Sequence, residues 1–369
     1  MKRGLIHRLR QVCALGSLAA LATISTPASA STINQNTSWT ITKSGATSTY
    51  RVVAYGDSIF AGYNGALFSV AKRAAPLVDG EYAVYPWNAN VLVVRRTKSG
   101  AVASDIYNNK IVGEKSYMQD ASTRVVEFEM CGNDFLQARS NFAGQSGTCN
   151  YGVLDTALSN CTTYQQAAMQ YINANASANV KVKMISNLYY PGYNADNANS
   201  SCSDPTTGQK INKQTKFLPY LAHSNWRACN FANTYGFKCV DAFAQYMGAD
   251  YDSNGDGKVD SDALKYVQGE AENDYVNRIS VTLRSTLRDA NTHFVNSSTS
   301  YDYIQSDDTH PTYYGSATIG LNIFTGSGSG SGAPDFSSSQ IVGGKNPAWN
   351  QYGHERMGWG LSAFNPTTP

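Results

Sequence analysis

Short apolar runs alternate with longer segments of helical periodicity along the middle of this 369-residue chain. The apolar runs are rich in β-branched residues and predict buried strands, while the longer segments space their apolar residues as helices do. Strands separated by helices imply right-handed crossovers and a parallel sheet that is covered on both faces. The predicted strands are Arg51–Tyr55, Val91–Val94, Arg124–Met130, Val180–Ser186 and Phe237–Val240, and the predicted helices between them are Ala66–Ala75, Gly100–Asn108, Asp155–Ala174 and Asn212–Tyr235.

Five parallel strands of this kind match the flavodoxin-like doubly wound class, which is a three-layer α/β sandwich. The chain is long for five strands, so we expect substantial insertions. The polar segment Asn187–Gln209 is the clearest of these, and long loops of this kind are usually functional rims or covers. After the last strand, the segment Asp262–Phe294 predicts one long helix.

The two ends of the chain differ in composition from its middle. Residues 1–30 begin with basic side chains, continue with the apolar run Val12–Ile24 and end in small residues, which predicts a secretory signal peptide. The apolar run is too short to span a membrane. Near the other end, residues 326–332 alternate Gly and Ser as a flexible linker does. Too few residues follow for a separate domain, so we expect a single domain over 31–369 whose C-terminal helix packs on it.

Composition and charge narrow the class of partner. Hydrophobic residues make up 42% of the chain, charged residues make up 15%, and the formal net charge is +2. Because the charge is nearly balanced, the composition gives no reason to expect nucleic acid or an acidic surface as a binding partner. Together with the predicted signal peptide and the lack of another long apolar run, this favours a secreted protein, extracellular or periplasmic, without an integral membrane segment; we expect a monomer.

Six cysteines remain once the leader is removed. An even number in an exported protein favours disulfides over a metal cluster, and the chain has no Cys-x-x-Cys pair. Many connectivities satisfy this count, and Cys229 with Cys239 is the preferred local pair because it closes a short loop. The six are Cys131, Cys149, Cys161, Cys202, Cys229 and Cys239.

The first predicted strand ends in Gly56-Asp57-Ser58-Ile59, which presents a serine just beyond the strand. In open parallel sheets, ligands bind outside the carboxyl ends of the strands, so Ser58 lies where chemistry can occur. A three-residue motif fits a plain turn equally well. Serine acts as a nucleophile only with a base within hydrogen-bond reach and a third group that orients the base.

Only one of the four histidines outside the leader lies in a polar loop. His310 follows Asp307 by three residues, a spacing that lets a short turn place the carboxylate on Nδ1 and leaves Nε2 to take the proton of Ser58. The adjacent Asp308 is an alternative orienting acid. An ordinary turn with a surface histidine is the alternative without chemistry.

Acyl transfer also needs donors for the developing oxyanion. The third predicted strand leads into Gly132-Asn133-Asp134, where Asn133 can donate from its side chain. After the second strand, Gly100 can offer a backbone N–H at close approach. These residues and Ser58 all follow neighbouring strands, so they are predicted to face one crevice.

Together, four sequence blocks resemble the signature blocks of the SGNH (GDSL) hydrolase superfamily, in the same order. They are Gly56-Asp57-Ser58-Ile59, Gly100, Gly132-Asn133-Asp134 and Asp307-x-x-His310, and the resemblance covers roughly Tyr50 to Thr318.

The resemblance implies the SGNH hydrolase fold, with Ser58 as nucleophile, His310 as base and Asp307 as its partner. It also implies an oxyanion hole built from the backbone N–H groups of Ser58 and Gly100 and the side chain of Asn133. Asp57 is then left to brace the turn. Two features depart from the family pattern: the second block lacks the Asn that often precedes its glycine, and Cys131 stands where members often have glycine. Cys131 suggests a disulfide that braces the oxyanion hole.

These residues predict hydrolysis of carboxylic esters by a serine hydrolase without a redox cofactor or catalytic metal. A general esterase or lipase is the first choice. An O-acetyl esterase that acts on polysaccharides is the alternative, because the loops are rich in tyrosine and asparagine. An alternative of another class is a non-catalytic, calcium-stabilised carbohydrate-binding protein. All four blocks keep the residue types that catalysis needs, which disfavours this alternative.

One further loop predicts a structural calcium site. Between residues 252 and 263, oxygen-bearing side chains occupy the first, third, fifth and ninth positions of an EF-hand pattern, with glycine at the sixth. The twelfth position is Ala263 where a bidentate glutamate is expected, and Asp262 can substitute for it. A plain Asp/Gly-rich turn is the alternative. The predicted ligands are Asp252, Asn254, Asp256, Lys258, Asp260 and Asp262.

Overall fold

The computed structural model describes residues 33–62, 74–83, 87–249, 252–289, 293–295, 299–301, 303–304, 307–311, 315–316 and 319–320. The predicted signal peptide at 1–30, the linker at 326–332 and the C-terminal helix lie outside these residues. The single domain predicted over 31–369 therefore stays a prediction. Within the described part, no helix is both long and apolar enough to cross a membrane.

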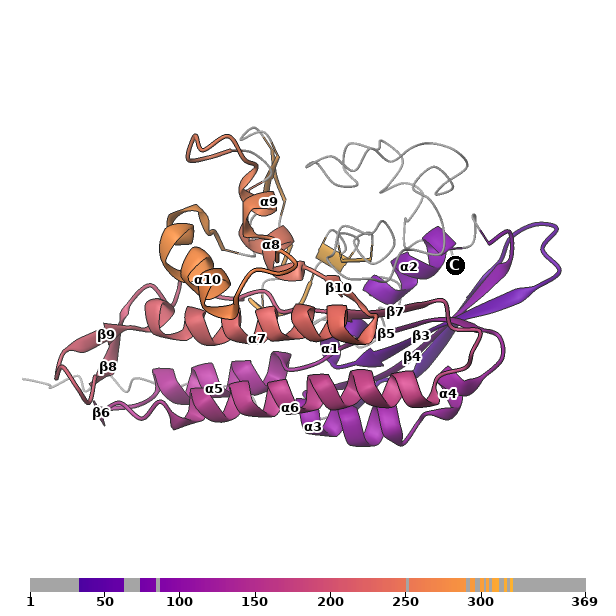
Figure 1. Ribbon diagram of the computed structural model, residues 1–369, viewed down its shortest axis with the longest axis horizontal. Helices are drawn as coiled ribbons and strands as arrows, with labels where there is room; N and C mark the ends of the chain where they lie inside the picture. The colour runs from indigo at the N-terminus through magenta and orange to yellow at the C-terminus, as the bar shows by residue number, and fades with distance from the viewer. Residues whose placement is uncertain are drawn as a thin grey trace, which may run out of the picture.

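A seven-stranded sheet forms the middle of the molecule, and its five parallel strands are the five predicted ones (Figure 1). Their spatial order is second, first, third, fourth, fifth, which is the flavodoxin-like order. The predicted fold class is thus confirmed. The strands are Thr49–Gly56 (β3), Asn90–Ser99 (β4), Thr123–Glu129 (β5), Val182–Ser186 (β7) and Lys238–Val240 (β10).

Two strands at the edge of this sheet were not predicted. Ile33–Asn34 (β1) and Thr37–Ile41 (β2) both pair antiparallel with β4. In β2 only Trp39 and Ile41 are partly buried, so the segment lacks the continuous apolar run that marks the central strands.

Helices pack on the sheet along its crossovers. Ala75–Ala83 (α2) contacts β3 and β4, and in Figure 1 it lies above the sheet, with Ala103–Asp105 (α3) and Gly152–Asn175 (α6) below. The β3-to-β4 crossover runs the opposite way along the sheet from the later ones. A right-handed connection therefore puts its helix on the opposite face.

The later helices follow the prediction in part. The predicted Asp155–Ala174 and Asn212–Tyr235 correspond to α6 and to Lys213–Tyr235 (α7). The predicted Gly100–Asn108 is α3 followed by a π-helical turn over Ile106–Val112 (η2). Gly132–Ala143 (α5) was not predicted as a helix, and most of the predicted Ala66–Ala75 lies outside the described residues.

The long helix predicted over Asp262–Phe294 is wrong. The chain turns at Gly269, whose φ is +88°, and Arg278 donates to the carbonyl of Lys265 and pairs with Glu270. A side chain thus satisfies the carbonyls at the end of a short helix, so no continuous helix is needed. The structure has Asp260–Leu264 (α9), Glu272–Asn277 (α10), Arg278–Thr282 (η3), Arg284–Thr286 (η4) and the strand His293–Val295 (β11), which pairs with Thr299–Tyr301 (β12).

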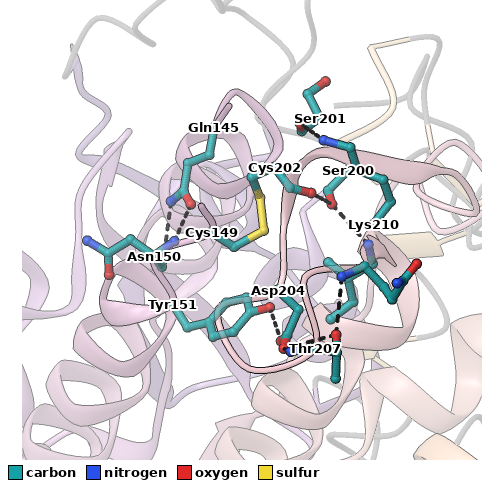
Figure 2. The surroundings of a disulfide bond; sticks show 12 residues. Gln145, Cys149, Asn150, Tyr151, Ser200, Ser201, Cys202, Asp204, Thr207 and Lys210 are labelled. Atoms are coloured by element: carbon teal, nitrogen blue, oxygen red, sulfur yellow. Dashed lines mark hydrogen bonds between the residues drawn. A yellow bond between two sulfur atoms is a disulfide. The ribbon is translucent and has the colours of Figure 1, made fainter. Parts of the chain in front are cut away.

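The predicted insertion Asn187–Gln209 forms part of a small separate sheet. Asn199–Ser203 (β8) pairs with Gly147–Thr148 (β6) and with Lys210–Asn212 (β9). Figure 2 shows the disulfide Cys149–Cys202 that joins this sheet to the start of α6, beside the bond from Tyr151 to Asp204. The insertion is therefore covalently tied to the main body.

The preferred cysteine pair is confirmed. Cys229 and Cys239 form a disulfide between α7 and β10. Cys131 and Cys161 are buried and are not disulfide-bonded in the structure.

Candidate active site

Ser58 lies on a tight turn between β3 and the short helix Ser58–Ala61 (α1). Asp57 caps this helix, because its carboxylate accepts from the N–H of Ile59 at 2.9 Å. A Cβ on Gly56 would lie 2.5 Å from Oε1 of Glu129, so a larger residue there would displace the Glu129 carboxyl group. Glu129 thus packs against the turn, and Asp57 stabilises the turn through its bond to the N–H of Ile59, as predicted.

The structure brings His310 to Ser58 across 252 positions of sequence. Nε2 of His310 lies 2.8 Å from Oγ of Ser58, and Nδ1 lies 2.6 Å from Oδ2 of Asp307. Because Asp307 is the acid in contact with Nδ1, the geometry favours it over the alternative, Asp308. With Nδ1–H donating to Asp307, Nε2 is left to accept from the hydroxyl of Ser58.

The carboxylate of Asp307 is held ionised by its own turn. Burial alone would raise its pKa, but the bond with the His310 ring and bonds from the backbone N–H groups of His310 and Thr309 outweigh burial. The pKa of Asp307 is therefore below its ordinary value of 3.8. A negative charge next to Nδ1 is one that would stabilise an imidazolium at His310.

Tyr189 holds the loop that carries His310. Its hydroxyl donates to the carbonyl of Thr309 at 2.7 Å, and its ring stacks on Tyr246 with the ring centroids 4.5 Å apart. Burial raises the pKa of Tyr189 well above its ordinary value, so the hydroxyl stays a donor. Sequence reasoning missed this residue, although its position three residues after β7, at the same edge of the sheet, was a usable signal.

Replacement of Tyr189 by Phe removes one buried hydrogen bond without changing the ring. We expect kcat to fall roughly three- to ten-fold, because a lost bond of this kind is worth about 1 kcal/mol and the base is no longer fixed. Tyr246→Phe is the matched control, since its hydroxyl has no hydrogen-bond partner among the described residues. Equal kcat values for the two variants on an ester substrate would contradict the positioning role.

Asn133 and Asp134 tie the third sequence block to the loop after β4. Nδ2 of Asn133 donates to Oδ2 of Asp57 at 2.8 Å and to the carbonyl of Ala101 at 3.0 Å, and Asp134 accepts from the N–H of Ala103 at 2.8 Å. Gly100 has a φ of +75° and lies three residues beyond Thr97, which pairs with Gly56. The structure therefore brings the predicted oxyanion donors to the same edge of the sheet as Ser58.

A pair of buried acids underlies the nucleophile turn. Glu129 and Asp57 are both almost fully buried, and Oε1 of Glu129 accepts from the N–H of Asp57 at 2.5 Å. Burial raises the pKa of both groups, and the nearby Asp57 charge raises that of Glu129 further. The neutral form of Glu129 is therefore favoured, and Asp57 accepts from the side chain of Asn133. Sequence reasoning missed Glu129; an acid inside an apolar strand was the available signal.

Asp134→Asn is expected to change the pH dependence of stability. Burial raises the pKa of Asp134 from 3.8 to about 6. Because the folded pKa is above the unfolded one, ionisation opposes folding, and stability falls by up to about 3 kcal/mol as pH rises through this window. Asn can accept from Ala103 and stays neutral, so the variant should gain melting temperature relative to wild type between about pH 4 and about pH 7.5. If the difference in melting temperature between Asp134→Asn and the wild type does not increase with pH, this explanation is contradicted.

The predicted calcium loop has only part of its ligand set in one place. Both carboxylate oxygens of Asp252 accept backbone N–H groups within the loop, and Asn254 bonds to Asp256. Asp260 instead bonds to Ser253, and Asp262 pairs with Lys265. Among the His, Cys, Asp and Glu side chains of the described residues, three that lie close enough to share a metal ion are found elsewhere, at Cys131, Asp134 and Cys161.

Calcium binding stays a prediction, which melting curves can test. If the loop holds calcium, a chelator lowers the melting temperature of the wild-type protein, because the ion binds the folded loop only. Asp252→Asn should then melt at the lower temperature with or without chelator. An unchanged wild-type melting temperature in chelator would exclude the site.

Comparison with known proteins gives matches in structure alone. No protein-family model and no curated protein sequence matches the chain. A lipase from a goat rumen metagenome is 15% identical over 74% of this chain and 95% of its own, with a TM-score of 0.46. An acetylxylan esterase from Geobacillus stearothermophilus is 12% identical over 76% and 94%, with a TM-score of 0.40. A protein described as a GDSL-like lipase from Parabacteroides merdae is 10% identical over 76% and 97%, with a TM-score of 0.41.

The three matched structures are thus a lipase, an acetylxylan esterase and a protein described as a GDSL-like lipase. This likeness is one of fold. With identities of 10–15% and TM-scores below 0.5, it gives no single residue a role. The roles proposed below therefore depend on the contacts of this chain's own side chains.

Proposed function

We propose that this protein is a serine hydrolase that cleaves carboxylic esters through a covalent acyl-enzyme. The observation that carries the proposal is the series of contacts from Ser58 Oγ to His310 Nε2, at 2.8 Å, and from His310 Nδ1 to Asp307, at 2.6 Å. A hydroxyl, an imidazole and a carboxylate in this order can serve as nucleophile, general base and orienting group.

The reaction follows from the roles of these three side chains. His310 takes the proton of Ser58 as Oγ attacks the ester carbonyl carbon, and Asp307 stabilises the imidazolium. The tetrahedral intermediate collapses, the bond to the alcohol oxygen breaks, and His310 gives its proton to the leaving alcohol. Water then attacks the acyl-enzyme with His310 again as base, which releases the acid and restores Ser58.

The oxyanion is proposed to bind between the first three sequence blocks. The backbone N–H groups of Ser58 and Gly100 and the amide of Asn133 are the donors. Since both N–H groups of Asn133 donate to protein oxygens in the structure, one of them must turn to the substrate. Asp57 is the partner that Asn133 keeps, because a carboxylate binds an N–H more strongly than the carbonyl of Ala101 does.

The substrate is proposed to be a carboxylic ester of the esterase or lipase type, met outside the cytoplasm. Two disulfides support export, because such bonds persist in oxidising compartments. An O-acetyl group on a polysaccharide is the alternative substrate, supported only by the tyrosine- and asparagine-rich loops.

Two assays on the purified protein test the proposal. A fluorophosphonate probe, which reacts with activated serines, should label Ser58 alone, as read by peptide mass spectrometry. p-Nitrophenyl esters of increasing acyl length, run beside an acetylated polysaccharide, separate the two substrate classes. Absence of both labelling and hydrolysis would refute the proposal and favour a non-catalytic binding protein.

A further inference from the structure

Two buried cysteines lie against each other behind the turn that carries Asn133. Cys131 immediately precedes helix α5, and Cys161 lies within helix α6, which packs on α5. Both side chains have no solvent exposure. Their sulfur atoms lie within 4.8 Å of each other.

We propose that Cys131 and Cys161 form a third disulfide in the mature protein, and that this bond fixes the turn of the oxyanion hole. The disulfide itself does not depend on what the site does. The second part, its effect on Asn133, rests on the function proposed above.

Geometry and backbone conformation both support the bond. Helices α5 and α6 are packed neighbours, so the sulfurs need to approach by only a few ångströms to reach the roughly 2 Å of a disulfide. Cys131 has a φ of +85°, in the left-handed region that residues with a side chain seldom adopt. Glycine would suit this backbone better, so a cysteine here calls for a role that glycine cannot fill, and a disulfide is such a role.

The remaining cysteines support the same conclusion. The other four cysteines of the mature chain already form two disulfides, which indicates that the chain folds under oxidising conditions. Two adjacent thiols in that setting are expected to be oxidised as well. Cys131 and Cys161 are the two that complete the even count.

The chemistry is an exchange with an external disulfide. The two cysteines give up two protons and two electrons as the bond between their sulfurs forms. An oxidised dithiol or oxidised glutathione accepts them and becomes two thiols. Burial raises the pKa of both cysteines, which suppresses the reactive thiolate in the folded protein. The bond therefore forms while α5 and α6 are still assembling.

The bond joins the residue before Gly132-Asn133 to the middle of a long helix. Asn133 must exchange one of its protein hydrogen bonds for the oxyanion, so its backbone needs to stay in place while the amide turns. A covalent link to α6 limits movement of this turn. The expected effect is on the transition state, and thus on kcat more than on KM.

Thiol counting decides whether the bond exists. The exported protein, purified without reductant, is unfolded in guanidinium chloride with EDTA and N-ethylmaleimide, and its peptides are analysed by mass spectrometry. We expect no alkylated cysteine and a linked pair of peptides that contains Cys131 and Cys161. Two alkylated cysteines at these positions would overturn the proposal. Two alkylated cysteines together with one bound zinc per native chain would assign the pair, with Asp134, to a metal site instead.

A variant tests the effect on the site. Cys161→Ala removes the bond and leaves the turn at Cys131 unchanged. We expect kcat for ester hydrolysis to fall several-fold with KM nearly unchanged, while Ser159→Ala, an exposed change on the same helix, has no effect. If the wild type is shown to carry the disulfide and Cys161→Ala has the same kcat as the wild type, the positioning effect is refuted. An inactive wild type would refute the proposed function, and the thiol count would still decide the disulfide.

Discussion

Ser58→Ala lowers the rate of ester hydrolysis by roughly 10⁴- to 10⁶-fold and leaves the protein folded. The size follows from loss of the nucleophile, after which neither His310 nor Asp307 has a covalent step to assist. Folding is unaffected, because the cap on α1 is made by Asp57 and not by the serine hydroxyl. The measurement is kcat/KM on a p-nitrophenyl ester beside a thermal melt.

The control for this variant is Ser159→Ala, in which the replaced serine is exposed on α6. It should retain wild-type activity. If Ser58→Ala is active, or if both variants lose activity together, Ser58 is not the nucleophile.

Asp307→Asn is expected to lower kcat by roughly 10³- to 10⁴-fold. An amide can donate to Nδ1, which favours the tautomer with the proton on Nε2, and that tautomer cannot accept the proton of Ser58. Because the pKa of Asp307 is below its ordinary value, the wild-type carboxylate stays ionised as pH falls to about 4. The loss of activity in the variant should therefore be present throughout the neutral and mildly acidic range.

Asp308→Asn is the matched control, since Asp308 is adjacent and exposed. Its φ of +55° is one that asparagine tolerates, so the loop should keep its shape. Near-normal activity in Asp308→Asn together with the loss in Asp307→Asn assigns the orienting role to Asp307. The opposite pattern would assign it to Asp308.

The sequence predicted the central sheet because its strands carry a signal that does not depend on their neighbours. Each is a buried run of β-branched and apolar residues, and right-handed crossovers then restrict the strand order. Strand β2 has no such run, since it lies at the edge and none of its residues is fully buried. The segment Asp262–Phe294 has the composition of a helix, but Arg278 and the turn at Gly269 break it, and these contacts cannot be read from periodicity.

The candidate site divides in the same way. Ser58, Asn133, Asp307 and His310 could be proposed from the sequence because each belongs to a short motif with its own spacing. Tyr189 and Glu129 were missed because their roles come from contacts with Thr309 and Asp57, far away in the sequence. No local pattern records such a contact.

The separation of 252 positions between Ser58 and His310 has a consequence for the order of events during folding. The proposed nucleophile directly follows the first parallel strand, whereas its proposed base lies on a loop that follows the last one. Closing a loop of this length costs conformational entropy, so the contact between the two residues is expected to form late in folding. Catalytic competence is thus a long-range property of the chain. It is acquired after the sheet forms, so during refolding the return of ester hydrolysis should lag behind the return of secondary structure.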